Sequence, residues 1–137
     1  MSGRVQIEDD DFVDAFLHCR IASTGFDHRA HLRIAWLLLN RLPLGDAIEA
    51  TCKGIERIAR HFGVPDKYNR TMSEALVRLI ARARADDPGA GFEEFLARNV
   101  ALSRDVRGVL AQYYSSDRLT SAEAKRCFMA PDLRALP

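Results

Sequence analysis

One stretch limits the fold of this chain more than any other: residues 26–42, with the sequence FDHRAHLRIAWLLLNRL. At about 100° per residue, a helix here gathers Arg29, Arg33 and Asn40 on one narrow face. The opposite face is apolar and contains Leu32, Ala35, Leu38, Leu39 and Leu42. Pro43 disfavours helical backbone just before it and so predicts the end of this helix. The chain must therefore provide other elements that cover a long apolar helix.

The segment before this stretch predicts one more helix. Residues 1–8 are expected to be frayed. Residues 9–11 are all aspartate, which suits an N-cap and a first turn near the positive end of a helix dipole. We expect this helix to run to about Ile21. Either Thr24 or Asp27 is expected to cap the central helix.

Start and stop signals also bracket two helices after the central one. A helix is predicted over residues 44–62, with Gly63 at the position after its end and Pro65 shortly beyond. Thr71 and Glu74 have the spacing of a capping box, which predicts that the next helix begins at Thr71.

The rest of the chain predicts short helices followed by an extended tail. Residues 86–91, DDPGAG, form the strongest loop signal. Prolines bracket the tail, residues 130–137, and Leu133 and Leu136 are expected to pin it across the other helices. No alternating strand pattern or hairpin signal competes. The expected fold class is all-α: a compact single domain over residues 1–137, with five to seven helices and an extended C-terminal tail.

Composition narrows the functional classes. A chain of 137 residues is long enough to bury a core. Its net charge of +1 gives no overall field to attract nucleic acid, and no apolar segment has the length of a membrane span. The polar N-terminus lacks the pattern of a signal peptide. Cys19, Cys52 and Cys127 show no paired spacing, so reduced thiols and a cytoplasmic location are expected.

The strongest candidate for chemistry is the pair His28 and His31, which falls on the apolar face beside Ala35. Side chains three residues apart on a helix lie about 5–6 Å apart at Cβ, so both imidazoles can reach one ligand. Three interpretations stay open: two buried structural histidines, metal-free binding or acid–base catalysis, and a divalent metal site. Metal is not favoured, because a third ligand is not evident and the spacing is not HExxH.

Two further segments are candidates for ligand binding. In residues 67–71, KYNRT, Lys67 and Arg70 flank the start of a predicted helix, where backbone amides could hold an anion. The alternative is an ordinary helix cap with flanking charges. The second segment is Tyr113 and Tyr114, followed by two serines, where pinning a loop is the alternative to a role in chemistry.

Several of these residues form a pattern that resembles a family of small bacterial proteins. That pattern reads F-x-H-x-x-H, then A-W, K-Y-H-x-T, Y-Y-S and P-D-L-x-x-L-P. In this chain it corresponds to residues 26–31, 35–36, 67–71, 113–115 and 131–137. The resemblance implies a bacterial all-α domain and marks sites without naming a reaction. Asn69 stands where such relatives carry histidine, which weakens the case for metal because an amide is a poor ligand for transition metals.

Two functional hypotheses follow. The first is a small-molecule pocket between helices, with His28 and His31 on one wall and Tyr68, Asn69 and Thr71 opposite; Lys67 and Tyr114 are further candidate ligand-binding residues. The second is a non-catalytic interaction module or homodimer. It is motivated by residues 34–39, which are more apolar than one packed face requires.

Overall fold

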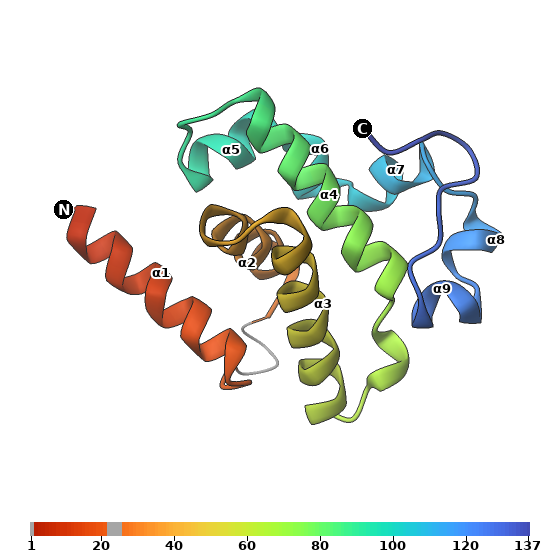
Figure 1. The fold of residues 1–137 in the computed structure, drawn as a ribbon, viewed down its shortest axis with the longest axis horizontal. Coiled ribbons are helices and arrows are strands. Elements are labelled where there is room, and N and C mark those ends of the chain that lie inside the picture. The colour runs from red at the N-terminus through yellow and green to blue at the C-terminus, as the bar shows by residue number, and fades with distance from the viewer. Residues whose placement is uncertain (1, 22–25) are drawn as a thin grey trace.

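The computed structural model describes residues 2–21 and 26–137. These residues form nine α-helices, one short 3-10 helix and no strand, which confirms the all-α class (Figure 1). The helices are α1 Ser2–Leu17, α2 His28–Arg41, α3 Leu44–His61, η2 Pro65–Lys67, α4 Arg70–Asp86, α5 Phe92–Arg98, α6 Val100–Arg104, α7 Val106–Ala111, α8 Ser116–Leu119 and α9 Ala122–Arg126. Their number exceeds the expected five to seven because the last third of the chain breaks into very short helices.

Helix α2 lies at the centre and packs against α1, α3, α4 and α6. Asp27 caps it by accepting a hydrogen bond of 2.9 Å from the Ala30 amide, whereas the alternative cap, Thr24, lies outside the described residues. Two apolar clusters meet on α2. Leu32 and Ala35 belong to the cluster shared with α4, and Ile34 belongs to the cluster shared with α1. The broad apolar surface of α2 is therefore covered by other helices of the same chain.

Helix α1 begins earlier than the sequence predicted. Residues 2–8 are helical, so the cap predicted within residues 9–11 is wrong. The acids serve a tertiary purpose instead, since Asp9 accepts a hydrogen bond of 2.9 Å from Arg33 of α2 and Asp10 pairs with Arg41. A charge pattern typical of a helix start here joins two helices.

The end of α1 also differs from the prediction. The helix stops at Leu17 rather than at about Ile21. Two residues later Cys19 has a φ of 54°, in the left-handed region where helices commonly terminate. The Arg20 amide then bonds the Ala15 carbonyl at 2.7 Å, which closes the terminal turn.

Helix α3 has the predicted start and ends one residue early, and Gly63 follows it with a φ of 71°. Its Gly54 lies where α1 crosses α3. A Cβ added there would overlap the ring of Phe16, which is fully buried. The close approach of α1 to α3 thus depends on a glycine that the sequence pattern did not single out.

The capping box predicted at Thr71 is wrong. The N-cap of α4 is Asn69, whose side-chain oxygen accepts a hydrogen bond of 2.9 Å from the Met72 amide. Glu74 is buried and pairs with the Arg70 side chain at 2.8 Å instead of accepting a hydrogen bond from the backbone amide of the N-cap residue. Thr71 lies inside the first turn, where its hydroxyl donates to backbone carbonyls of the C-terminal region.

The C-terminal tail, residues 130–137, forms no helix or strand but bends at residues 132–134, so it is extended only in part; it ends near α7 in Figure 1. The Leu133 amide donates to the Tyr113 carbonyl at 3.0 Å. Leu136 packs against the core cluster shared with α4, whereas the side chain of Leu133 is 59% exposed. The prediction that Leu133 pins the tail is therefore wrong, because its backbone and not its side chain makes the contact.

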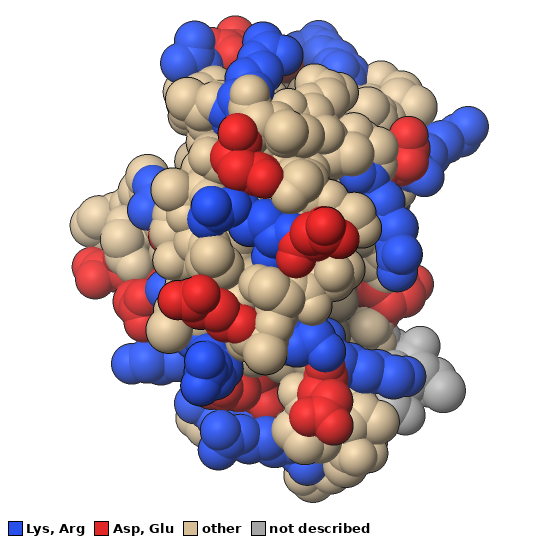
Figure 2. All heavy atoms as spheres, turned by 90° about the vertical axis from the view of Figure 1, so that its right-hand side faces the viewer, with Lys and Arg blue, Asp and Glu red and all other residues tan. Residues whose placement is uncertain are grey.

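The surface carries charges of both signs. Figure 2 shows lysine and arginine side chains interspersed with aspartate and glutamate over one face of the molecule. Many of them form pairs, such as Arg98 with Asp87 at 2.5 Å and Arg82 with Asp86 at 3.2 Å. In the described part of the chain, no helix combines the length and apolarity needed to cross a bilayer.

Candidate functional site

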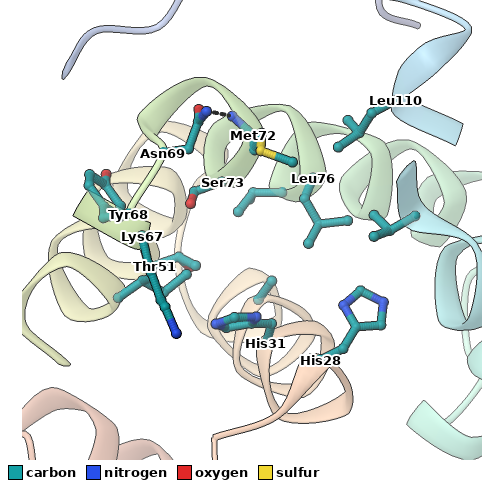
Figure 3. Close-up of a pocket in the computed structure, with 14 residues that line it drawn as sticks. His28, His31, Thr51, Lys67, Tyr68, Asn69, Met72, Ser73, Leu76 and Leu110 are labelled. Carbon is teal, nitrogen blue, oxygen red and sulfur yellow. Dashed lines mark hydrogen bonds between the residues drawn. The ribbon is translucent and has the colours of Figure 1, made fainter. Parts of the chain in front are cut away.

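A cavity of about 190 Å³ opens between α2, α3, the start of α4, and α7 (Figure 3). Its polar lining comes from three parts of the chain: His28, His31, Thr51, Lys67, Tyr68, Asn69 and Ser73. The remaining lining is apolar and comprises Ala35, Ile55, Met72, Leu76, Val77, Val106 and Leu110. The structure therefore brings both predicted histidines together with three residues of the predicted loop.

His31 is the histidine whose ring is free to meet a ligand. Its edge packs against Phe26 with ring centroids 4.4 Å apart, and neither ring nitrogen hydrogen-bonds another described residue. Burial lowers the pKa of His31 from 6.5 to about 4; the charge on His28 lowers it further and Asp27 opposes the shift. At neutral pH this imidazole is uncharged, with one nitrogen donating and the other accepting.

His28 is tied to a neighbouring helix. Its Nε2 lies 2.9 Å from the carbonyl oxygen of Leu102 in α6. Because a carbonyl can only accept, Nε2 must carry the hydrogen, which leaves Nδ1 as the acceptor in the neutral ring. His28 therefore anchors α2 to α6 and presents less free hydrogen-bonding capacity than His31.

Thr51 of α3 carries an unsatisfied polar atom. The residue is 2% exposed and lines the cavity, and its hydroxyl has no hydrogen-bond partner among the described residues. A buried hydroxyl without a partner costs roughly 1–3 kcal/mol. Sequence reasoning missed Thr51, since its position at the edge of an apolar stripe is ordinary and its isolation depends on tertiary packing.

The predicted loop contributes Lys67 and Tyr68 to the cavity but not Arg70. Lys67 is exposed at the cavity mouth and pairs with no described residue. Arg70 is engaged by Glu49 at 2.5 Å and by Glu74 at 2.8 Å. Because these carboxylates occupy its guanidinium, Arg70 cannot join Lys67 in holding an anion as the sequence suggested.

Neither the Cys52 thiol nor the Tyr68 hydroxyl ionises at neutral pH. Burial raises the pKa of the Cys52 thiol to about 11. Burial also raises the pKa of the Tyr68 hydroxyl, and the neighbouring Cys52 adds to that shift. Cys52 therefore lacks the thiolate that a nucleophilic cysteine needs.

Three predicted ligand-binding residues hold the C-terminal region. Asn69 lies in the cavity lining, but its amide donates to the Leu119 carbonyl at 2.8 Å and its oxygen caps α4. Thr71 lies outside the lining, with its hydroxyl 2.8 Å from the Ala124 carbonyl. Tyr114 also lies outside it and donates to the Met129 carbonyl at 2.8 Å. Residues of the resemblance pattern thus line the cavity, hold the C-terminal region or, like Asn69, do both.

A second cavity of about 310 Å³ adjoins the first. The two share His31, Ile55, Lys67 and Tyr68 as lining residues. The remaining lining of the second cavity is apolar: Phe26, Ile58, Ala59, Phe62 and Val64. His31 and Lys67 therefore stand between two largely apolar spaces.

No group of three histidine, cysteine, aspartate or glutamate side chains suited to a metal ion occurs in residues 2–21 and 26–137. His28 and His31 alone supply fewer ligands than a protein-held transition metal usually has. The arrangement can instead donate hydrogen bonds from Lys67 and Thr51, and it can donate, accept or take up a proton at His31.

Comparison of the chain with protein-family models, curated proteins and solved structures finds no match. The resemblance described under Sequence analysis therefore stays a prediction.

Proposed function

We propose that this protein binds a small molecule in the cavity between α2, α3 and α4. The observation that carries the proposal is Thr51, which lines the cavity and whose buried hydroxyl has no partner among the described residues. Folding rarely leaves such a group unsatisfied, and a bound ligand would supply the missing partner. His31 stands on the facing helix with free ring nitrogens, so one polar group of a ligand could meet both residues.

If the bound molecule reacts, His31 is the candidate acid–base group. Its neutral imidazole can accept a proton at physiological pH, whereas His28 is held by the Leu102 carbonyl. The lowered pKa makes His31 a weak base, which suits hydrogen bonding better than strong proton abstraction. We therefore place ligand binding first and catalysis second.

We place the alternative, a homodimer or interaction module, behind ligand binding. Ile34, Leu37 and Leu38 are each 4% exposed or less within the single chain. Trp36 and Leu39 pack partly buried against both apolar clusters. A partner is not needed to cover this helix.

From the free cysteines and the family resemblance we also propose a bacterial, cytoplasmic setting.

The test compares a threonine whose hydroxyl has no partner among the described residues with one whose hydroxyl is hydrogen-bonded. In Thr51→Val the unpartnered hydroxyl is removed, so the ligand-free protein should unfold in urea with unchanged or higher stability, by up to about 1 kcal/mol. The matched control is Thr71→Val, whose hydroxyl is fully bonded and whose loss should cost about 1–3 kcal/mol. A small-molecule screen then uses the methyl signal of Met72 in the cavity, with Met129 outside it as reference.

We expect hits that shift the Met72 signal to bind more weakly to Thr51→Val than to the wild type. The proposal fails if Thr51→Val is as unstable as Thr71→Val, because the hydroxyl would then have a partner in the folded chain. It also fails if no compound of a broad library perturbs Met72.

A further inference from the structure

We propose that the ligand is a small amphipathic monocarboxylate, with its carboxylate between Lys67, Thr51 and His31 and its apolar body in the adjoining cavities. This inference rests on the proposed function of the cavity and specifies the chemistry of what it binds. Three features of the lining carry it: the sign of the charge, the type of hydrogen-bonding group and the apolar remainder.

The lining selects for negative charge. Among the described residues, neither cavity is lined by an aspartate or glutamate, and Lys67 is the one lining side chain with a permanent charge. His31 is neutral at physiological pH. Lys67 pairs with no carboxylate in the described part of the chain, although most surface arginines do. An unpaired ammonium at the mouth of an apolar cavity favours an anionic guest.

Three polar groups of the lining can donate hydrogen bonds to one acceptor. The Lys67 ammonium, the Thr51 hydroxyl and the protonated nitrogen of His31 are all donors, and an ionised carboxylate is an acceptor only. Figure 3 shows the Lys67 side chain extending toward the His31 ring, with Thr51 on the same side of the cavity. A carboxylate here would give an acceptor to the buried Thr51 hydroxyl, which has no partner among residues 2–21 and 26–137.

The site suits one negative charge better than the double charge of a phosphate. Phosphates are usually held by arginine and by free amides at a helix start. Here Arg70 is occupied by Glu49 and Glu74, and the side chain of Asn69 takes the Met72 amide at the start of α4. A single ammonium remains, which matches a monocarboxylate.

Apolar side chains surround the space left for the rest of the ligand. Leu76, Val106 and Leu110 line the first cavity, and Ile58 and Phe62 line the second. Burial of one methylene strengthens binding by about fourfold. Affinity should therefore climb with chain length until the cavity is full.

The experiment titrates straight-chain monocarboxylates of increasing length, each beside the primary alcohol of the same length. Binding is followed through the methyl signal of Met72 and the ring signals of His31, with Met129 as the reference outside the cavity. We expect the carboxylates to gain about fourfold in affinity per methylene over the first members of the series. Each should bind about tenfold more tightly than its alcohol, because one partner of the hydrogen bond is charged.

Variants of Lys67 test the charge. Lys67→Met should abolish the preference for carboxylate over alcohol, and Lys67→Arg should keep it. Lys53→Met is the matched control, since Lys53 is an exposed lysine of α3 that lines neither cavity, and it should leave the preference unchanged. Lys67 is itself exposed, so its variants are expected to fold as the wild type does.

Three results would overturn the carboxylate inference. If alcohols bind in the cavity as well as their acids, or if Lys67→Met retains the preference, the charge plays no role; small-molecule binding at Thr51 would still stand. If no carboxylate shifts Met72 while other compounds of the library do, the ligand class is wrong. If no compound shifts the methyl signal of Met72, the proposed function itself is refuted.

Discussion

Acidification should weaken this protein through His31. The pKa of His31 is lowered from 6.5 to about 4 in the folded state, chiefly by burial. Between these two pH values the unfolded chain binds a proton that the folded chain does not, so the free energy of unfolding decreases as the pH falls. The stabilisation is fully present above pH 6.5 and is lost as the pH approaches 4. A pKa difference of this size corresponds to about 3 kcal/mol.

The assay is urea denaturation of the wild type and of His31→Gln at intervals from pH 7.5 to pH 4. Carboxylates also titrate in this range, but they are common to both proteins and largely cancel in the difference. The stability of the wild type relative to the variant should therefore fall by about 3 kcal/mol across the range. A constant offset is expected as well, since the variant loses the contact with Phe26.

A second variant, His31→Phe, separates packing from protonation because it keeps an aromatic ring against Phe26. It should show the same pH dependence relative to wild type as His31→Gln, with a smaller offset. A stability difference that does not change with pH for either variant would refute the burial of an uncharged His31. A difference that grows in the opposite direction would show that the folded state favours the charged ring.

Two further changes test packing away from the cavity. Gly54→Ala should destabilise the protein by about 1–3 kcal/mol in urea denaturation, because the added methyl overlaps Phe16, whereas Gly45→Ala has open space and should be neutral or stabilising; equal effects at both positions would contradict the tight helix crossing. Tyr114→Phe should cost about 1 kcal/mol and speed proteolysis of the tail, because the Met129 carbonyl loses its donor; an unchanged cleavage rate would show that this bond does not hold the tail.

The parts of the fold that were predicted correctly depend on local chemistry. The start of α2 follows from Asp27, the end of α3 from Gly63, and the interruption between these helices from Pro43. Each signal acts within a few residues of itself. Helix periodicity likewise placed His28 and His31 on one face, and the structure brings both to the cavity.

The parts that were missed depend on contacts between distant segments. The aspartates near the start of the chain read as a helix cap but pair with arginines of α2. Asn69 and Thr71 are comparable caps by local rules, and Thr71 is drawn instead to the Ala124 and Cys127 carbonyls more than fifty residues away. The same holds for Thr51, because only the packed structure shows that its hydroxyl has no partner in the described part of the chain.

The first turn of α4 performs two tasks at once. Asn69 lines the cavity and bonds the Leu119 carbonyl, and two residues later Thr71 bonds the segment that leads into the tail. A protease that trims the C-terminus, or an affinity tag fused to it, would thus disturb the turn of α4 that also lines the cavity. The geometry of one cavity wall therefore depends on α8 and on the chain that follows it.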